Sequence, residues 1–387
     1  MPYTTTSKNN LQKATLLKLA KTNKSELIPL RIEYSEKSKL VTSYVNKLVN
    51  VNRIYPRHLP TQASGRWSTL GVINEITREK SGGNITNWPR ACIEPACQYR
   101  LQELYKTTSK TYIEHEWTDT CWSLRDIITC DKNEVMFSWD HDNIEGKIHD
   151  LIVNDEAAIK AHREGYDLHT ITCCDIFGYD YPTNRKNPHT SKEDSQWRSK
   201  YNWQGKDTKQ RVLAKNFNHG SKYTESHRFV HKIQGIEQYG ISYKDLEHLA
   251  KRYIASKGEA WKRKLKIMES IRRSRVTRTL YGFRRVFFDS SAETGREGFS
   301  HMISGTVSDY NNMTLQLIEK RFGDTVRLLH NAHDGNKIAI KTYGLPKDSE
   351  AFKLHTIALQ KELREIIERD ITYQDRSLTM TAGIKVH

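Results

Sequence analysis

Apolar residues recur along this chain with two different spacings, which predict a mixture of strands and helices. Residues 126 to 139 form a strand-like apolar run that ends on the carboxylate of Asp140. From Asp140 to about Lys160 the spacing becomes helical, and helical spacing then dominates to about Arg273, apart from a polar loop at Tyr181–Lys200. The pattern therefore indicates an α+β chain in which strands flank a helical insertion.

The same two spacings continue towards the C-terminus. We expect a hairpin at Tyr281–Phe288 and a helix at Gly305–Arg321. Apolar residues alternate on both sides of Asp334–Gly335, which predicts a tight type I′ hairpin with Asp334 at its tip. A long amphipathic helix should occupy residues 349–370, followed by a short strand, and residues 27–49 fit one or two amphipathic helices.

The charge of the chain indicates a class of partner. Lys and Arg number 62 against 46 Asp and Glu, which gives a formal net charge of +16 at pH 7 and a pI near 9.4. Such a surface attracts polyanions and gains affinity as their counterions are released. Nucleic acid is the expected partner, although composition alone also fits a merely soluble basic protein.

Hydropathy and cysteine spacing argue against several other classes of protein. No apolar run approaches the ~18 residues that span a bilayer, and Met1–Lys13 is polar, so we expect an intracellular protein without a membrane span. The cytoplasm of a virus-infected host is the first choice; mitochondria are the alternative, because the first 25 residues lack acids. The six cysteines form no CxxC pair, which favours reduced thiols over disulfides or zinc.

Two aspartates occupy positions suited to metal binding. Asp140 lies where a strand gives way to a helix and Asp334 lies on a hairpin, so neither is on the face that packs the core. Hard oxygen ligands are what a pair of Mg²⁺ ions about 4 Å apart requires. We therefore expect both carboxylates to hold two Mg²⁺ ions, for which Mn²⁺ can substitute. Singly, Asp334 could be only a turn former and Asp140 only a helix N-cap.

Between the aspartates, four polar residues recur every four positions, so that they share one face of a helix: Arg211, Lys215, His219 and Tyr223. The two cations could clamp a triphosphate and the two rings could stack on bases. A solvated basic helix is the alternative. Glu145, five residues after Asp140, could crowd the 2′-hydroxyl of a bound nucleotide, and His169 could donate to a phosphate or be an ordinary histidine.

In this order, the residues resemble the polymerase region of family A DNA polymerases, the group that contains bacterial DNA polymerase I and its bacteriophage relatives. Asp140 to Glu145 resembles the first palm motif (DYSQIE), Arg211 to Tyr223 the fingers motif, and Ala332 to Gly335 the second palm motif (VHDE). Ala63 to Arg66 is similar to a TGR segment and Asn84 to Pro89 to NLQNIP.

The resemblance implies an α+β right-hand architecture with an antiparallel palm sheet, helical fingers and a truncated thumb. A thumb remnant would occupy residues 1–50, the first part of the palm 51–148, the fingers 149–290 and the second part of the palm 291–387. The activity implied is primer extension with dNTPs on a DNA template by two-metal nucleotidyl transfer.

The resemblance also implies roles for individual residues. Asp140 and Asp334 would bind both metals, assisted by the backbone carbonyl of His141, and Lys215 would act in catalysis. The nucleotide would be bound by Asn143, Glu145, His169, Arg211, Lys215, His219 and Tyr223. The DNA would be contacted by Arg66, Asn84, Asn87 and His333.

Four positions depart from the family pattern. His219 replaces Phe or Tyr, Gly335 replaces a glutamate beside the second catalytic aspartate, and Ser304 stands where a minor-groove-reading Gln is usual. Lys147 follows Gly146 where Leu-Arg is expected. These departures put base stacking, the accessory carboxylate and mismatch sensing in question.

Leu30 to Val45 resembles the thumb helix near the palm, and only about 25 residues precede it, so we expect neither the rest of the thumb nor an exonuclease domain in this chain. We therefore expect a second polypeptide to supply the thumb tip and the 3′–5′ exonuclease, as in a polymerase gene split in two, and a processivity factor is a further expected partner. Two alternatives stay open at this point: a single-subunit RNA polymerase, which Glu145 disfavours, and a DNA-binding subunit that has lost catalysis.

Overall fold

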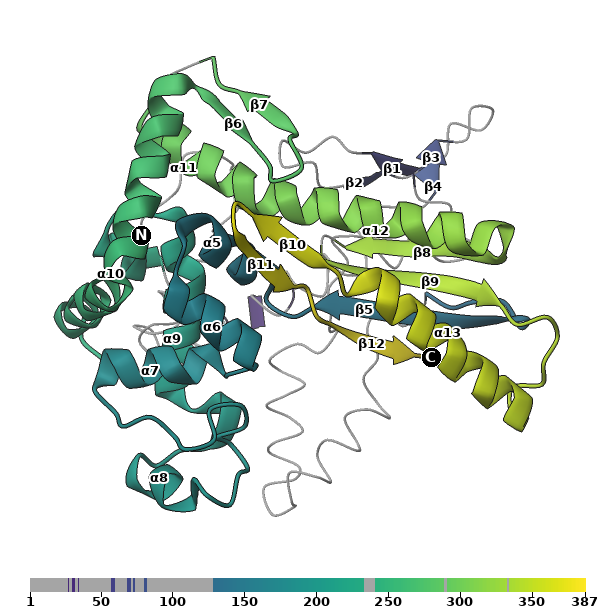
Figure 1. The fold of residues 1–387 in the computed structure, drawn as a ribbon, viewed down its shortest axis with the longest axis horizontal. Helices are drawn as coiled ribbons and strands as arrows, with labels where there is room; N and C mark the ends of the chain where they lie inside the picture. The colour runs from purple at the N-terminus through teal and green to yellow at the C-terminus, as the bar shows by residue number, and fades with distance from the viewer. Residues whose placement is uncertain are drawn as a thin grey trace. The chain divides into compact units, whose positions relative to one another are not determined.

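The computed structural model describes residues 128–387 except 233–240, 289–290 and 333, together with residues 27, 30, 31 and 34 and four short N-terminal strands (Figure 1). The chain divides into two compact units, one of residues 1–60 and 67–130 and one of residues 61–66 and 131–387. In the first, the strands pair antiparallel: β1 (Arg57–Leu59) with β2 (Ser68–Leu70), and β3 (Val72–Ile73) with β4 (Lys80–Ser81). Residues 27, 30, 31 and 34 are helical, as expected.

The second unit mixes helices and strands in the predicted order. It begins with β5 (Glu134–His141) and continues through six helices: α5 (Ile144–Val153), α6 (Glu156–Glu164), α7 (Leu168–Phe177), α8 (Ser195–Lys200), α9 (Lys209–Gly220) and α10 (Tyr243–Ser274). Next come β6 (Val276–Arg278), β7 (Arg284–Val286), α11 (Ala292–Ser300) and α12 (Thr306–Phe322). The unit closes with β8 (Val326–Ala332), β9 (Gly335–Lys341), α13 (Glu350–Ile367), β10 (Asp370–Tyr373), β11 (Arg376–Thr379) and β12 (Ala382–Val386).

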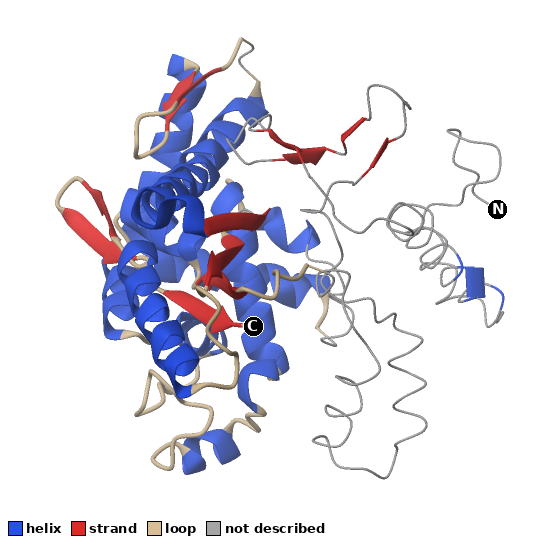
Figure 2. Cartoon of the chain, turned by 90° about the vertical axis from the view of Figure 1, so that its right-hand side faces the viewer, coloured by secondary structure: helices blue, strands red, loops and turns tan. Residues whose placement is uncertain are grey.

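The central sheet has the strand order β12-β5-β9-β8, and every neighbouring pair is antiparallel. Strand β5, the first of these four in the chain, is therefore enclosed by strands from the C-terminal part, as the blue β5 between yellow and green strands shows in Figure 1. This arrangement confirms the predicted α+β class and the antiparallel sheet. Helices lie around these strands in the second view (Figure 2).

One face of the sheet is covered by α12 and α13. Along β5 the residues Val135, Phe137 and Trp139 are buried at every second position, as a half-covered strand requires. They pack with Ile318 of α12 and with Leu363 of α13 in one hydrophobic cluster. Because strand side chains alternate, Asp140 is directed to the opposite face and is exposed.

The helices build two further hydrophobic clusters. One contains Ile148 of α5, Phe299 of α11 and Tyr310 of α12, and the other contains Cys173 of α7, Phe217 of α9 and further residues of α8 to α10. Helix α10 contributes to both, and its backbone is non-helical at Gly258 (φ 46°, ψ −117°), between the two contributions.

Several predicted boundaries were wrong. Strands were expected over residues 126–139, but in the described part of that range the strand β5 begins only at Glu134. The helical pattern expected from Asp140 to Lys160 is two helices, because Asn154 ends α5 in a left-handed conformation and Asp155 caps α6. The hairpin expected at 281–288 has its strands at Val276–Arg278 and Arg284–Val286, with Gly282 in the turn.

The hairpin between β8 and β9 lies where it was predicted. Ala332 pairs with Gly335, so the turn lies before Gly335. Gly335 does not have the positive φ that a type I′ turn centred on Asp334–Gly335 would need, so that centring was wrong. The dipeptide Asp-Gly suggested that turn, but Gly335 already belongs to the strand.

Three cysteines lie in the part of the chain that the structure describes. Cys130, Cys173 and Cys174 are free thiols, as expected from the lack of paired spacing. Among the residues that the structure describes, none of the helices is long and apolar enough to cross a membrane.

Candidate functional site

The two aspartates singled out in the sequence lie beside each other at one end of the sheet. Strand β5 ends at Asp140 and His141, and the β8–β9 hairpin turns at Asp334. The backbone N–H of His141 donates to the backbone carbonyl of Asp334 over 3.1 Å, and Asp140 pairs with Gly335. Adjacent strands are about 4.8 Å apart, so strand pairing brings together residues that are almost two hundred positions apart.

Both cross-strand neighbours of Asp140 are glycines. Gly335 faces it on β9 and Gly383 faces it on β12, and directly opposed residues share one face of a sheet. No side chain on either flanking strand therefore covers the Asp140 carboxylate at this level of the sheet.

The two glycines differ in the space around them. A Cβ added to Gly335 would lie 2.7 Å from the backbone carbonyl oxygen of Trp139, whereas a Cβ added to Gly383 meets no atom within 4 Å. The glycine at 335, where the family pattern has a glutamate, therefore has a steric reason in this fold.

The side chain of His141 lies on the face of β5 opposite to that of Asp140. It is buried, and its ring meets the edge of Tyr310 with the centroids 5.3 Å apart. Burial lowers the pKa of His141 to about 4, so the ring is neutral at pH 7. The imidazole belongs to the core, which leaves only the backbone of this residue for the role expected from the sequence.

Glu145 lies in the first turn of α5 and is held from two sides. The Tyr223 hydroxyl donates to Oε2 of Glu145 over 2.9 Å, and the Ser304 hydroxyl donates to Oε1 over 3.1 Å. The donors come from the turn after α9 and from the helical turn before α12, so two distant segments fix one carboxylate.

Asn143 precedes α5 in a left-handed conformation, with φ 51°. Its side-chain amide lies against the backbone of Gly146, because an added Cβ at Gly146 would come within 2.5 Å of it. Asn143 thus lies between β5, which contains Asp140, and α5, which contains Glu145.

Helix α9 carries three of the four residues of the expected stripe. Lys215 and His219 are exposed, Arg211 is buried, and Tyr223 lies in the 3₁₀ turn Ser221–Tyr223 that follows the helix. The ring of His169 lies 5.7 Å from the ring of His219, centroid to centroid. The helix thus brings a cation and an imidazole alongside a second imidazole from α7.

Arg211 is engaged by a carboxylate that sequence reasoning did not single out. Its guanidinium donates to both oxygens of Asp167, over 2.9 and 3.0 Å. Asp167 also caps α7 by accepting from the backbone N–H of His169, and His189 lies 2.8 Å from it. Arg211 therefore fixes the N-terminus of α7, where His169 is located. An Asp two residues before His-Thr is an N-cap signal that could have pointed to it.

His169 has a defined tautomer in this network. The side-chain amide of Asn218 donates to Nδ1 of His169 over 3.0 Å, which leaves the proton on Nε2. Burial, followed by the charge of Arg211, lowers the pKa of His169 to about 3. The ring is therefore a neutral N–H donor.

Four expected DNA contacts lie outside the described residues: Arg66, Asn84, Asn87 and His333. In the part of the chain that is described, no group of three or more His, Cys, Asp or Glu is arranged to hold a metal ion. The backbones of Asp140 and Asp334 are thus neighbours, but their side chains do not belong to a complete protein-made cage in this part of the chain.

Comparison with known proteins gave a structural match only. No protein-family model and no curated protein sequence matches the chain. The fold is similar to that of the POL domain of Pol1 from M. smegmatis, solved in complex with DNA primer-template and dNTP, with a TM-score of 0.64 and 17% sequence identity. The match covers 100% of this chain and 57% of that chain, so the chain spans a little over half of its length.

The Arg211–Asp167 pair generates a stability prediction. Asp167→Asn should lower the free energy of unfolding at pH 7 by about 3 kcal/mol, because it leaves a buried guanidinium without its carboxylate. Burial opposes ionisation, but hydrogen bonds from His189 and Arg211 hold the pKa of Asp167 well below its usual range. The stabilisation should therefore be complete above about pH 4 and shrink as the pH falls further.

Urea unfolding of both proteins between pH 7 and pH 3 measures this difference. Asp207→Asn, at an exposed position, serves as the control and should change stability by less than about 0.5 kcal/mol. Equal stability of wild type and Asp167→Asn at pH 7 would contradict the prediction.

The two glycines beside Asp140 form a matched pair for mutation. Gly335→Ala should destabilise the fold by about 1–3 kcal/mol, because the new Cβ would overlap the Trp139 carbonyl. Gly383→Ala has room for its methyl group and should be neutral or slightly stabilising. Thermal unfolding of the two variants compares them directly, and an equal effect at both positions would refute the steric explanation.

Proposed function

We propose that this chain is a template-directed DNA polymerase module of the family A type, which adds deoxynucleotides to a primer 3′ end and releases pyrophosphate. The observation that carries the proposal is the juxtaposition of Asp140 and Asp334 at one end of an antiparallel sheet. The similarity of the fold to the POL domain of Pol1 supports it. On this proposal the sheet is the palm and α6 to α10 are the fingers.

The carboxylates fit the metal ions that such a reaction uses. Asp140 is exposed and Asp334 is half-buried, and they offer hard oxygen ligands from the end of β5 and from the β8–β9 turn. Mg²⁺ usually keeps several waters and takes only one or two carboxylates plus substrate phosphates, which suits a two-carboxylate site. Asp140 and Asp334 would hold two Mg²⁺ or Mn²⁺ ions, with the His141 carbonyl as a further ligand. Bound there, the ions would favour deprotonation of the primer 3′-hydroxyl and neutralise the pyrophosphate.

The chain's own groups would mainly position the nucleotide. The exposed ammonium of Lys215 supplies a positive charge for the triphosphate, and His169 supplies a neutral N–H donor beside it. Arg211 is already paired with Asp167, so in this state it organises the His169 helix. Phosphoryl transfer asks the protein for little beyond such positioning and charge stabilisation.

Glu145 supports synthesis of DNA rather than RNA. Its two oxygens accept from Tyr223 and Ser304, so the carboxylate is held in one orientation and could act as a steric gate against a 2′-hydroxyl. Ser304, which departs from the family pattern, would then serve the gate rather than read the minor groove.

A DNA-binding subunit without catalysis is the second candidate. It was suggested by Gly335 and His219, but the steric cause found for Gly335 weakens that argument. The second polypeptide, the processivity factor and the DNA contacts outside the described residues stay predictions.

Primer extension tests the proposed function. Asp140→Asn and Asp334→Asn should each abolish extension of a labelled primer with dNTPs and Mg²⁺, while affinity for the primer-template duplex changes little, because only metal ligands are lost. Gel analysis of extension and fluorescence anisotropy of DNA binding measure the two properties. Near wild-type extension by either variant would refute the proposal, and so would a wild-type chain that binds DNA but extends with neither dNTPs nor rNTPs.

Lys215→Ala tests the phosphate clamp separately. Loss of a charge-assisted contact should raise KM for dNTP and lower kcat, with kcat/KM falling by about 10- to 100-fold. Lys209→Ala, which removes an exposed lysine from the start of the same helix, is the control and should leave both constants near wild type. Steady-state kinetics that showed the same loss in both variants would mean that the effect is one of overall charge.

A further inference from the structure

The break in α10 separates two parts of the molecule. Before Gly258, Leu246, Ala250 and Tyr253 pack in the cluster that contains α9. After it, Ala260 and Met268 pack in the cluster that contains α5. The break therefore lies close to the change from one cluster to the other, and Trp261, after Gly258, still packs against the first of them.

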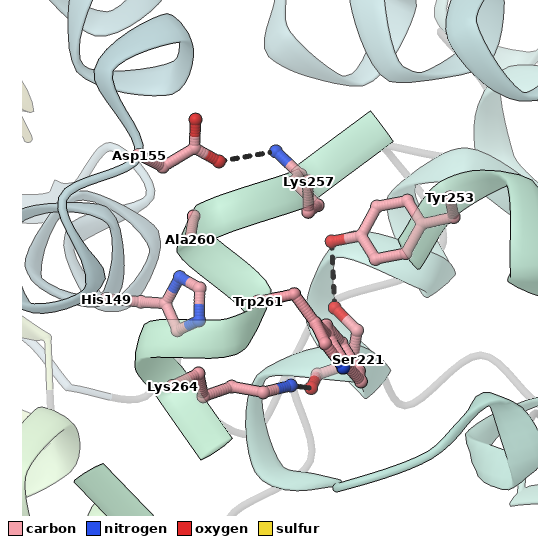
Figure 3. Close-up of a pocket in the computed structure, with 8 residues that line it drawn as sticks. All are labelled: His149, Asp155, Ser221, Tyr253, Lys257, Ala260, Trp261 and Lys264. Atoms are coloured by element: carbon pink, nitrogen blue, oxygen red, sulfur yellow. Dashed lines mark hydrogen bonds and ion pairs between the residues drawn. The ribbon is translucent and has the colours of Figure 1, made fainter. Parts of the chain in front are cut away.

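A small cavity lies at this break (Figure 3). It is lined by His149, Asp155, Ser221, Tyr253, Lys257, Ala260, Trp261 and Lys264. It has room for about one water molecule, too little for a nucleotide or another organic ligand. The polar groups that line it therefore interact with one another rather than with an organic ligand.

Ser221 is held from both sides of the break. Nζ of Lys264, after Gly258, donates to the backbone carbonyl of Ser221 over 2.8 Å. The hydroxyl of Tyr253, before Gly258, shares a 2.8 Å hydrogen bond with Oγ of Ser221. Figure 3 shows both bonds converging on Ser221 from the two arms of the helix.

Lys264 is an unusual residue to find at such a position. It is 1% exposed, and its Nζ lies 3.2 Å from the centroid of the Trp261 ring. Burial lowers the pKa of Lys264 to about 6, partly offset by Glu225. The neutral amine can still donate to a carbonyl, so the bond to Ser221 does not require the charge. Burying a lysine costs free energy unless its Nζ is hydrogen-bonded, and the bond to Ser221 offsets part of that cost.

Ser221 is only two residues from Tyr223, which belongs to the proposed nucleotide site. Ser221 opens the 3₁₀ turn that ends at Tyr223, and Tyr223 donates to Glu145. Any shift of Ser221 would move the Tyr223 hydroxyl and loosen one of the two hydrogen bonds that orient the Glu145 carboxylate.

We propose that Lys264 and Tyr253 are positioning residues that hold the Ser221–Tyr223 turn and, through Tyr223, set how strictly Glu145 discriminates against ribonucleotides. This inference rests on the proposed function, because it concerns the sugar selectivity of that same site. Lys264 and Tyr253 would affect sugar selectivity without contacting the nucleotide.

Selectivity in primer extension tests the inference. Lys264→Met removes the donor with little change in volume, and Tyr253→Phe removes only the hydroxyl. Each should lower the ratio of kcat/KM for dNTP to kcat/KM for rNTP by about fivefold, the worth of one hydrogen bond of about 1 kcal/mol. Lys262→Met is the control, because Lys262 is an exposed lysine of the same helix that pairs with Glu259 over 2.7 Å rather than with Ser221 or Tyr253. Its ratio should equal that of wild type.

A double-mutant cycle separates positioning from general damage. If Lys264 and Tyr253 act through Glu145, their substitutions should not change the ratio further in a Glu145→Ala background. Wild-type ratios in both single variants, or an equal loss in the Glu145→Ala background, would overturn the inference. Should Lys264→Met fail to fold, Tyr253→Phe decides alone. A wild-type chain that extends with neither nucleotide overturns the proposed function and this inference with it; a selective wild type with unresponsive variants overturns this inference only.

Discussion

The pairing of β5 with β9 is the contact on which the rest of the candidate site depends. It joins the strand that ends at Asp140 to the hairpin that turns at Asp334, and the His141 N–H to Asp334 carbonyl bond closes that end of the sheet. Antiparallel pairing fixes both register and face, since a slip of one residue would turn Asp140 into the core. The buried alternation of Val135, Phe137 and Trp139 against α12 and α13 resists such a slip.

A second level of organisation surrounds Glu145. Hydrogen bonds from Tyr223 and Ser304 connect the first turn of α5 to the end of α9 and to the helical segment before α12. The buried groups behind it, Lys264 and Tyr253, continue this connection across the break in α10. Similarly, Asp167 connects α7 to α9 through Arg211. Polar groups thus join elements of the two helical clusters to one another, as Tyr223 and Glu145 do, and also elements within one cluster, as Arg211 and Asp167 do.

Much of the fold could be predicted because its elements have clear periodicity. The β8–β9 hairpin, α12, α13 and the single helix that carries Arg211, Lys215 and His219 were recognised from local patterns. The division of α5 from α6 was missed because Asn154 and Asp155 interrupt the helix with a left-handed cap and a new N-cap, while the apolar spacing continues across them. The turn was predicted to be centred on Asp334–Gly335, which was wrong because register, not composition, decides that β9 begins at Gly335.

The sequence by itself determined which residues could carry chemistry: the two aspartates at strand ends, the glutamate after the first of them, and the cations on one helix. It could do so because spacing within one element fixes a shared face. Only the tertiary structure decided that Arg211 pairs with Asp167, that Ser304 supports Glu145, and that position 335 has no room for a side chain. Those facts depend on the close approach of segments far apart in the chain, which no local spacing encodes.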